Sequence, residues 1–335
     1  MGQGDGVVAD QKRKIVGRIV ALIALCAVLA FVFFDRLDQR DFPRVETTAN
    51  LSCSRSDSVM SLAYANLHDA VYLEGQTGDV FNHYLLLANE PGRAVLLGSD
   101  RLSTDPMDWT TVSDRYAVHD YYESDDAISV DGRHYLFEEG QIFELVGDPA
   151  EGSGHWKVVG TYPDETDDVG VFFDGETLHL LGEYGKFPHG FDGTSIAYFT
   201  GDLTFERWDV VDLAIAEPTG ILPSKWGLGD ATVAVADEGI LLITDIESQD
   251  IPYHLALWIA SSWGEPFRFA GIIAAPMGGT NELDNHRVQD GEVVPTEDGG
   301  FVLFANWRDI DGISRQNVPV MPDGTTRFVG SYMCD

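Results

Sequence analysis

Five acidic residues each stand at the start of a short segment of apolar and β-branched residues: Asp69, Asp126, Asp168, Asp230 and Glu292. Carboxyl groups can act as acid and base on one substrate when the fold brings them together, because crowding of negative charge raises the pKa of one of them. The alternative is structural, since an Asp at the start of a strand also caps turns and forms hydrogen bonds between neighbouring elements. The arrangement of the five segments decides between the two.

Each acid-led segment passes through an acidic-Gly turn into a second apolar segment, a pattern typical of a β-hairpin. The leading acids are 57, 42, 62 and 62 residues apart, which suits units of about four strands. An aromatic residue follows each leading acid after 30 to 40 residues, at Trp109, Trp156, Trp208, Phe267 and Phe328. We therefore predict an all-β fold, a five-bladed β-propeller over residues 53–335 preceded by one N-terminal transmembrane helix. A β-sandwich is the alternative.

Two cysteines, Cys53 and Cys334, stand at the two ends of the predicted propeller. The short connections from Phe328 to Cys334 and from Cys53 to Asp69 add up to the length of one connection between units. A disulfide between Cys53 and Cys334 would therefore close the ring, and two free thiols are the alternative. Cys26 lies in an apolar segment, where it is a small apolar residue.

The composition is strongly acidic, with 55 Asp and Glu residues against 21 Lys and Arg and a formal net charge of −34. This charge excludes a nucleic-acid groove as the main surface, because phosphate would be repelled. A dense Asp coat with almost no Lys favours a protein from a salt-loving source, since high salt screens the self-repulsion. The hydrophobic fraction of 44% is sufficient for a sizeable core.

The segment 15–34 contains twenty residues with a single charge, Arg18, and is long enough to span a bilayer. No Ala-x-Ala site follows it, so an uncleaved signal anchor is favoured over a removed signal peptide. More positive residues precede the segment than follow it, which places residues 1–14 in the cytoplasm and everything after the anchor outside. Residues 35–52 are predicted to form a stalk, in which Asn50 begins a glycosylation sequon. The expected location is the cell membrane, with a single pass.

The third unit, Asp168-Val-Gly-Val-Phe-Phe-Asp174-Gly175, resembles the third-blade motif of the five-bladed furanosidase superfamily, which includes glycoside hydrolase family 43, invertases and levansucrases. The unit that begins at Asp126 is similar to the second-blade strand pair of that superfamily. The turns that end at Trp109 and Trp208 resemble its edge turns. The resemblance covers about residues 60 to 330 and rests on the order of these motifs along the chain.

The resemblance implies roles for three acids. Asp69 matches the nucleophile or general base, and Asp168 matches the residue that orients the substrate and tunes the pKa of the acid. The fourth-blade Glu-Gly-Pro that carries the family's general acid has no counterpart, and Asp230 stands there instead. The first-blade Asp-Pro is replaced by Asp69-Ala70. Asp126 matches no catalytic residue of the family, so the structural interpretation is favoured for it.

Further residues are candidates for substrate binding, either by hydrogen bonding or by stacking on a sugar ring: His68, Asp126, Trp226, His286, Arg287 and Glu292. The resemblance also implies a structural calcium or sodium ion in the central funnel, near a fifth-blade His. No other cofactor is expected. The sequence contains no Gly-rich phosphate loop, Cys-x-x-Cys pair, His-Glu-x-x-His or Gly-x-Ser-x-Gly motif.

These observations predict a surface-tethered, glycoside hydrolase-like propeller that acts on furanosides or pentose-containing glycans. Its partners would be a glycan and the membrane. Two alternatives stay open: a non-catalytic propeller that binds carbohydrate or another surface ligand, and an assembly component, which would expose a large apolar patch.

Overall fold

The computed structural model divides the chain into two compact units, Met1–Arg44 and Val45–Asp335. All residues whose structure is described belong to the second unit: 53–55, 59–62, 67–76, 79–89, 93–103, 108–113, 126–147, 154–185, 194–217, 227–236, 239–247, 254–274, 287–296, 301–308, 326–329 and 331–334. Within these ranges, no helix has the length and apolar character needed to cross a bilayer. The predicted cytoplasmic tail, the anchor at 15–34, the stalk and Asn50 lie outside the described residues.

Four antiparallel sheets each consist of four consecutive strands. Sheet I contains β3 (Leu67–Glu74), β4 (His83–Asn89), β5 (Arg93–Ser99) and β6 (Thr110–Ser113). Sheet II contains β7 (Asp126–Val130), β8 (Arg133–Glu138), β9 (Gln141–Val146) and β10 (His155–Thr161). Sheet III contains β11 (Thr166–Phe173), β12 (Leu178–Tyr184), β13 (Ser195–Gly201) and β14 (Asp209–Ala216). Sheet IV contains β15 (Gly227–Ala236), β16 (Gly239–Glu247), β17 (His254–Ala260) and β18 (Arg268–Ala274).

The remaining strands come from both ends of the second unit. Sheet V pairs β19 (Arg287–Pro295) with β20 (Phe301–Arg308), then β22 (Ser331–Cys334) and finally β1 (Cys53–Arg55). A two-stranded sheet joins β2 (Val59–Leu62) to β21 (Thr326–Val329). The predicted propeller class is confirmed. The sequence predicted five blades of one kind, whereas four sheets of consecutive strands are found and sheet V is assembled from distant segments.

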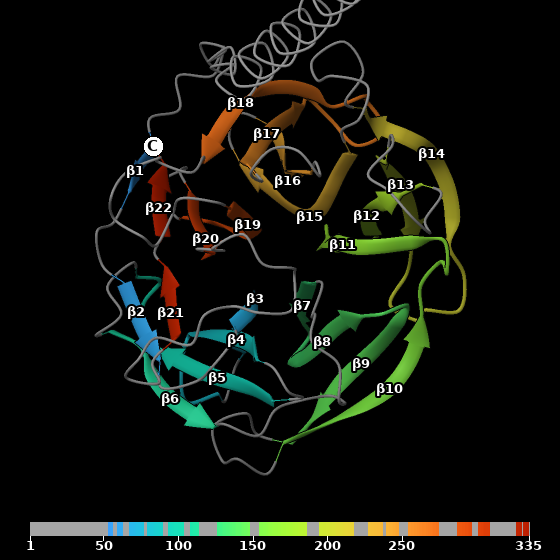
Figure 1. Cartoon of the computed structure of the whole chain (residues 1–335). Helices are drawn as coiled ribbons and strands as arrows, with labels where there is room; N and C mark the ends of the chain where they lie inside the picture. The colour runs from blue at the N-terminus through green and yellow to red at the C-terminus, as the bar shows by residue number, and fades with distance from the viewer. Residues whose placement is uncertain are drawn as a thin grey trace, which may run out of the picture. The chain divides into compact units, whose positions relative to one another are not determined.

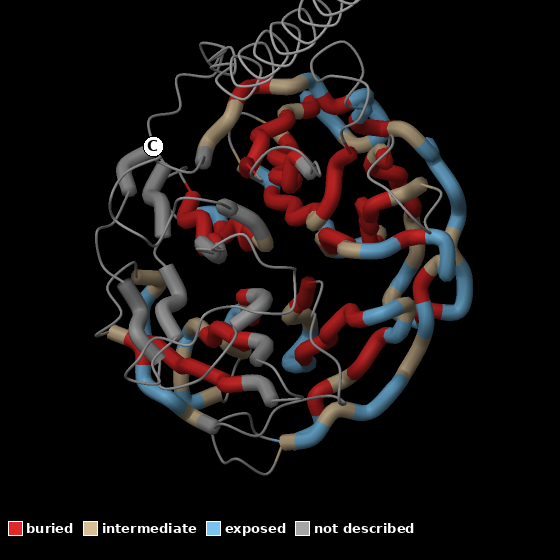
Figure 2. The backbone as a smooth tube through the Cα atoms, viewed as in Figure 1, coloured by how far each residue is buried: buried red, intermediate tan, exposed pale blue. Residues whose placement is uncertain are grey.

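The first strands of the five sheets surround a common centre, as Figure 1 shows. Each contacts the next in the order β3, β7, β11, β15 and β19, and β19 contacts β3. Apolar side chains fill the space between neighbouring sheets, with Leu86 packed near Leu136 between sheets I and II and Leu257 near Leu303 between sheets IV and V. Buried residues follow the inner strands, while β10 and β14 at the outside are largely exposed (Figure 2). Burial between radial sheets is the arrangement that defines a propeller, and it rules out the β-sandwich alternative.

The aromatic markers of the sequence locate the outermost strands of sheets I to IV. Trp109, Trp208 and Phe267 directly precede β6, β14 and β18, and Trp156 is the second residue of β10. The fifth marker behaves differently, because Phe328 lies in β21 of the two-stranded sheet. The aromatic marker was therefore correct for four units and wrong for the fifth, whose predicted strand pair is found as β19 and β20.

The two ends of the second unit meet at β1 and β22, where Cys53 and Cys334 are directly opposite in an antiparallel pair. Opposite residues in such a pair have Cα separations within the range that a disulfide requires. The side chains of both residues lie outside the described part of the structure, so the disulfide stays a prediction.

We expect reduction of the folded protein, or the substitution Cys334→Ser, to lower the free energy of unfolding by about 2–4 kcal/mol, because the bond would close a loop of nearly the whole unit. Denaturant unfolding with and without reductant measures this change. Cys26→Ser is the control and should leave the reductant effect intact. Equal unfolding curves with and without reductant would show that both thiols are free.

Candidate functional site

Three inner strands carry an Asp at the same irregularity, a β-bulge in the pairing with the second strand of the sheet. The register shifts at Asp168 in β11, between Gly229 and Thr232 in β15, and between Gln289 and Glu292 in β19. Asp168, Asp230 and Asp290 have positive φ angles of 42°, 45° and 52°. Asp tolerates this left-handed conformation better than most residues do. Bulges often re-aim a side chain next to an active site.

Asp69 falls within the corresponding shift of β3, between Leu67 and Ala70. Its side chain, like that of His68, is outside the described part. Because β3, β11, β15 and β19 surround one centre, the four bulges lie on inner strands of the ring. The catalytic roles of their acids stay predictions.

The bulge in β19 corrects the sequence alignment of the fifth unit. The sequence identified Glu292 as its leading acid, but Asp290 occupies the bulge and has the positive φ angle of Asp168 and Asp230. Glu292 follows in regular pairing with Phe304. The Asp290-Gly291 pair was the available signal. It was missed because the weaker fifth repeat was aligned on its apolar residues.

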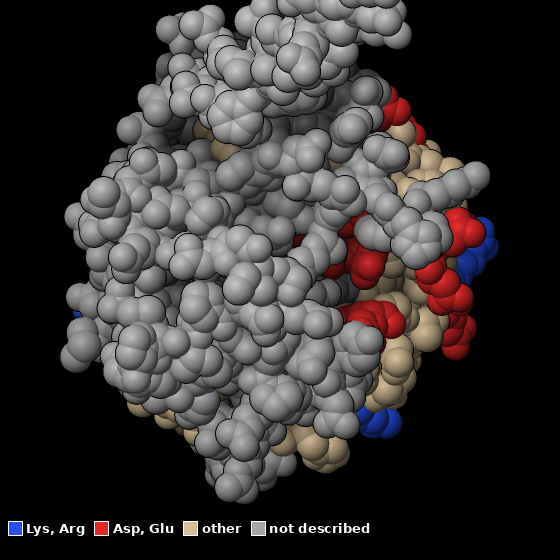
Figure 3. Space-filling view, in the orientation of Figure 1, with Lys and Arg blue, Asp and Glu red and all other residues tan. Residues whose placement is uncertain are grey.

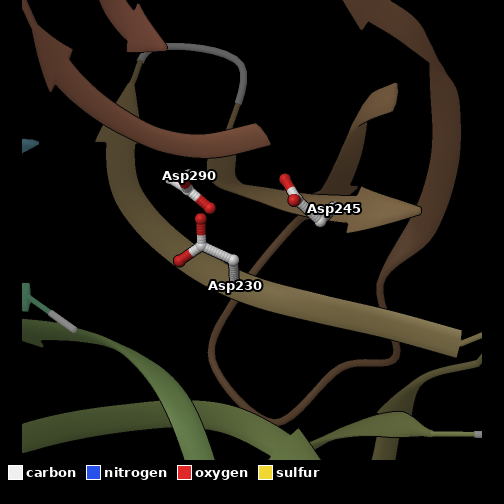
Figure 4. A group of neighbouring side chains, drawn as sticks. All are labelled: Asp230, Asp245 and Asp290. Carbon is white, nitrogen blue, oxygen red and sulfur yellow. The ribbon is translucent and has the colours of Figure 1, made fainter. Parts of the chain in front are cut away.

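Asp230 and Asp290 form a cluster with Asp245, which the sequence did not predict. One carboxylate oxygen from each lies within 4.8 Å of the others. Figure 4 shows the carboxylates of Asp230 and Asp290 directed at each other, with that of Asp245 approaching from β16. Asp245 is 1% exposed. Three carboxylates at this separation repel unless they share protons or hold a cation, and oxygen ligands of this kind suit calcium.

Asp126 has a structural role and is not at a bulge. It pairs with Phe137 in regular register at the start of β7. Its Oδ1 accepts a hydrogen bond from the Ala127 amide, and its Oδ2 accepts one from the Val171 amide of β11, each at 2.6 Å. Burial raises the pKa of Asp126 to about 8, against the lowering effect of these two hydrogen bonds. Asp126 therefore links sheet II to sheet III, as the structural interpretation of the sequence held.

Glu292 links three sheets. Its Oε1 accepts a hydrogen bond from the Tyr72 amide of β3, and its Oε2 accepts one from the Thr232 hydroxyl of β15, each at 3.1 Å. The side chain is buried, with 5% of the residue exposed. Burial raises the pKa of Glu292 well above its usual value, and the negative charges of Asp126 and, more weakly, Asp230 raise it further. The carboxyl groups of Asp126 and Glu292 are therefore neighbours across the centre of the ring.

A cavity of about 800 Å³ opens beside these two carboxyl groups. The inner strands line it, with Tyr72, Phe172, Val233 and Val294 beyond the bulges of their strands and Ser129 on β7. Among its described lining residues are Asp126 and Glu292, and neither Asp168 nor Asp230 is among them. Figure 3 shows carboxylates exposed near the middle of one face, over β11 and β8. The predicted site residues thus separate into bulge acids, of which Asp168 and Asp230 do not line the cavity, and two buried acids beside it.

Besides His68, three of the predicted binding residues have no described side chain. Trp226 and His286 lie outside the described residues, and Arg287 is described only as the first residue of β19. Their assignments remain predictions, as does the expected ion near a fifth-blade His.

No protein-family model matches this chain, and no curated protein matches it. Solved structures do match its fold. A thermostable family-43 glycoside hydrolase has a TM-score of 0.56 at 12% identity, with 82% of this chain and 89% of that chain covered. An alpha-L-arabinofuranosidase from Lactobacillus brevis has a TM-score of 0.54 at 11% identity, with 82% and 93% covered. A GH32 beta-fructofuranosidase from Bombyx mori has a TM-score of 0.54 at 10% identity, with 82% and 61% covered. At these identities the similarity establishes the propeller fold alone.

Proposed function

We propose that this chain is a glycoside hydrolase-like propeller that acts on furanosides or pentose-containing glycans, with sheet V as its fifth blade. The observation that carries the proposal is the shared bulge position of Asp168, Asp230 and Asp290 on neighbouring inner strands, with Asp69 at the corresponding backbone position of β3. The structural similarity to a family-43 hydrolase and an arabinofuranosidase supports the substrate class.

In this proposal Asp69 is the nucleophile or general base, Asp168 orients the substrate, and Asp230 is the general acid. Glycoside hydrolysis needs two carboxyl groups on opposite sides of the scissile bond, about 5–5.5 Å apart for retention and about 6.5–9.5 Å apart for inversion. The proposal requires that acids on different inner strands face each other across the scissile bond. The tether at 15–34, adaptation to high salt and a calcium or sodium ion in the funnel belong to the same proposal.

A second candidate function is carbohydrate binding without hydrolysis. It is favoured by the missing fourth-blade Glu-Gly-Pro and by the position of Asp230 among two other carboxylates. If that cluster holds a cation permanently, Asp230 has no proton to donate to a leaving group.

The test is hydrolysis of a panel of aryl-furanosides and aryl-pyranosides by the full-length protein in molar salt. Asp69→Asn and Asp168→Asn should each lower kcat/KM by about 10²–10⁴-fold, the usual contribution of a positioned acid or base. Asp167→Asn is the matched control, because Asp167 is the exposed neighbour of Asp168 on the same strand. Its rate should be unchanged. Oligosaccharide binding without hydrolysis in the unsubstituted protein would support the binding function instead.

A further inference from the structure

A hydrogen-bonded chain of Ser129, His134 and Asp79 begins at the wall of the cavity, where Ser129 lies. The Ser129 hydroxyl is 2.8 Å from His134 Nδ1, and His134 Nε2 is 3.1 Å from Asp79 Oδ2. The same Asp79 oxygen accepts a hydrogen bond of 2.7 Å from the Gln76 amide. Three segments contribute: β7, β8 and the loop between β3 and β4. No local sequence motif could therefore have revealed the chain.

The hydrogen bonds of His134 run in the direction that a nucleophilic serine needs, with the serine hydroxyl as donor and the imidazole as acceptor. A carboxylate only accepts hydrogen bonds, so the proton of the neutral His134 ring is on Nε2, facing Asp79. Nδ1 is then the acceptor, and the Ser129 hydroxyl donates to it. Burial lowers the pKa of His134, against the opposing effect of Asp79, so the ring is neutral and able to accept a proton near pH 7.

The surroundings hold the imidazole rigidly and leave the serine accessible. The His134 side chain is 5% exposed and that of Asp79 is 14% exposed. The Tyr84 ring meets His134 edge-on, with 6.2 Å between the ring centroids. Ser129 is half-buried and is one of the residues that line the cavity. A buried base beside an accessible hydroxyl is the arrangement found where serine acts as a nucleophile.

Histidines near the start of the second strand recur in neighbouring sheets, which provides an internal comparison. His83 of β4 bonds the Tyr72 hydroxyl, and His179 of β12 lies between the Tyr198 hydroxyl and Asp174. The recurrence accounts for a His at this position. It does not account for Ser129, since both other histidines bond a phenol.

We propose that Ser129, His134 and Asp79 form a nucleophilic site that hydrolyses esters of short acyl groups, independent of the proposed glycosidase site. Ser129 Oγ attacks the acyl carbonyl carbon while its proton passes to His134 Nδ1. The tetrahedral intermediate expels the alcohol oxygen, which takes that proton, and the acyl group stays on Ser129. A water then attacks the acyl carbon, gives a proton to His134, and releases the carboxylic acid as Ser129 regains its proton.

The charge of the cavity limits the substrate. Glu74, Asp100, Asp126 and Glu292 line it together with one cationic side chain among its described residues, Arg101. The Arg101 guanidinium donates a hydrogen bond to Asp108 at 2.7 Å. The Glu74 and Asp100 carboxylates repel anions, so the site should select uncharged or cationic esters over anionic ones.

The test uses the full-length protein with p-nitrophenyl acetate, an uncharged ester, and with a p-nitrophenyl ester of succinic acid, which is anionic. The acetate should be hydrolysed at least about tenfold faster than the succinate. Ser129→Ala and His134→Asn should each lower the acetate rate by about 10²–10⁴-fold. A fluorophosphonate should label the peptide that contains Ser129, as read by mass spectrometry.

His179→Asn is the control, because it removes the corresponding network of sheet III without touching the cavity serine. It should keep the acetate rate, and thermal unfolding should show all three variants folded. An unchanged rate in folded Ser129→Ala, or a fluorophosphonate label only on another residue, would overturn the proposal, as would the absence of ester hydrolysis in the unsubstituted protein. In any of these cases the chain Ser129–His134–Asp79 only joins sheet II to the β3–β4 loop.

Discussion

Replacing Glu292 by alanine is expected to lower the free energy of unfolding by about 3–5 kcal/mol, the usual cost of breaking a buried polar network on one side. The substitution leaves the Tyr72 amide and the Thr232 hydroxyl without their acceptor. Each unsatisfied buried group costs about 1–3 kcal/mol, and the lost side chain adds a cavity. The Glu292 hydrogen bonds to both β3 and β15 are lost together, so the ring is weakened on both sides of sheet V.

Two further variants distinguish the loss of the Glu292 hydrogen bonds from the loss of a negative charge. Glu292→Gln keeps an oxygen that can accept from the Tyr72 amide. At neutral pH it should lower the free energy of unfolding by less than half as much as the alanine variant does. Glu206→Ala, an exposed acid before β14, should change the free energy by less than about 0.5 kcal/mol. Urea unfolding in molar salt measures all three. Equal losses for Glu292→Ala and Glu206→Ala would show that Glu292 does not hold the sheets together.

Stability is expected to fall as pH rises from about 4 to about 8. Burial raises the pKa of Asp126 from 3.8 to about 8 in the folded protein. A pKa above the unfolded value means that the folded state holds the proton more tightly. The stabilisation is therefore complete below the unfolded pKa and is lost as pH rises through the folded one. A tenfold difference in proton affinity corresponds to about 1.4 kcal/mol, so the raised pKa should give a decrease that denaturant unfolding can measure.

We expect the buried acids to cause the pH dependence of stability. Glu292 contributes in the same direction, and so does Glu138, whose pKa burial raises to about 8. Molar salt screens repulsion among the surface carboxylates, which leaves the buried groups as the main cause. Asp126→Asn should flatten the curve between pH 5 and pH 8 relative to the unsubstituted protein. A curve of unchanged slope in that variant would mean that surface charge causes the dependence.

The sequence was sufficient for the architecture where each blade is a run of consecutive strands. Each of the four aromatic markers lies at or directly before the start of the outer strand in its sheet, so the local repeat located the outer strands of sheets I to IV. These markers are Trp109, Trp156, Trp208 and Phe267. Sheet V was not predictable in this way, because β1 and β22 join β20 through contacts between the two ends of the unit. Hydrophobic periodicity carries no information about such long-range pairing.

The site was predicted in part. Asp168 and Asp230 share a bulge position, as the repeat suggested, and Asp126 bonds a neighbouring sheet. A bulge adds one or more residues to one strand, so an alignment of apolar residues slips there. That slip is why Glu292 was named in place of Asp290. Asp245 lies on a second strand, and only the fold brings it to Asp230.

The central claim is that the bulge acids face a bound sugar at one end of the channel. A crystal structure of the Asp168→Asn variant, soaked with an arabinofuranosyl oligosaccharide at saturating concentration, tests it most directly. We expect a sugar ring within hydrogen-bond distance of Asp230 and of the substituted residue 168, between β11 and β15. Sugar bound only in the cavity beside Asp126 and Glu292, or no sugar at all, would contradict the claim.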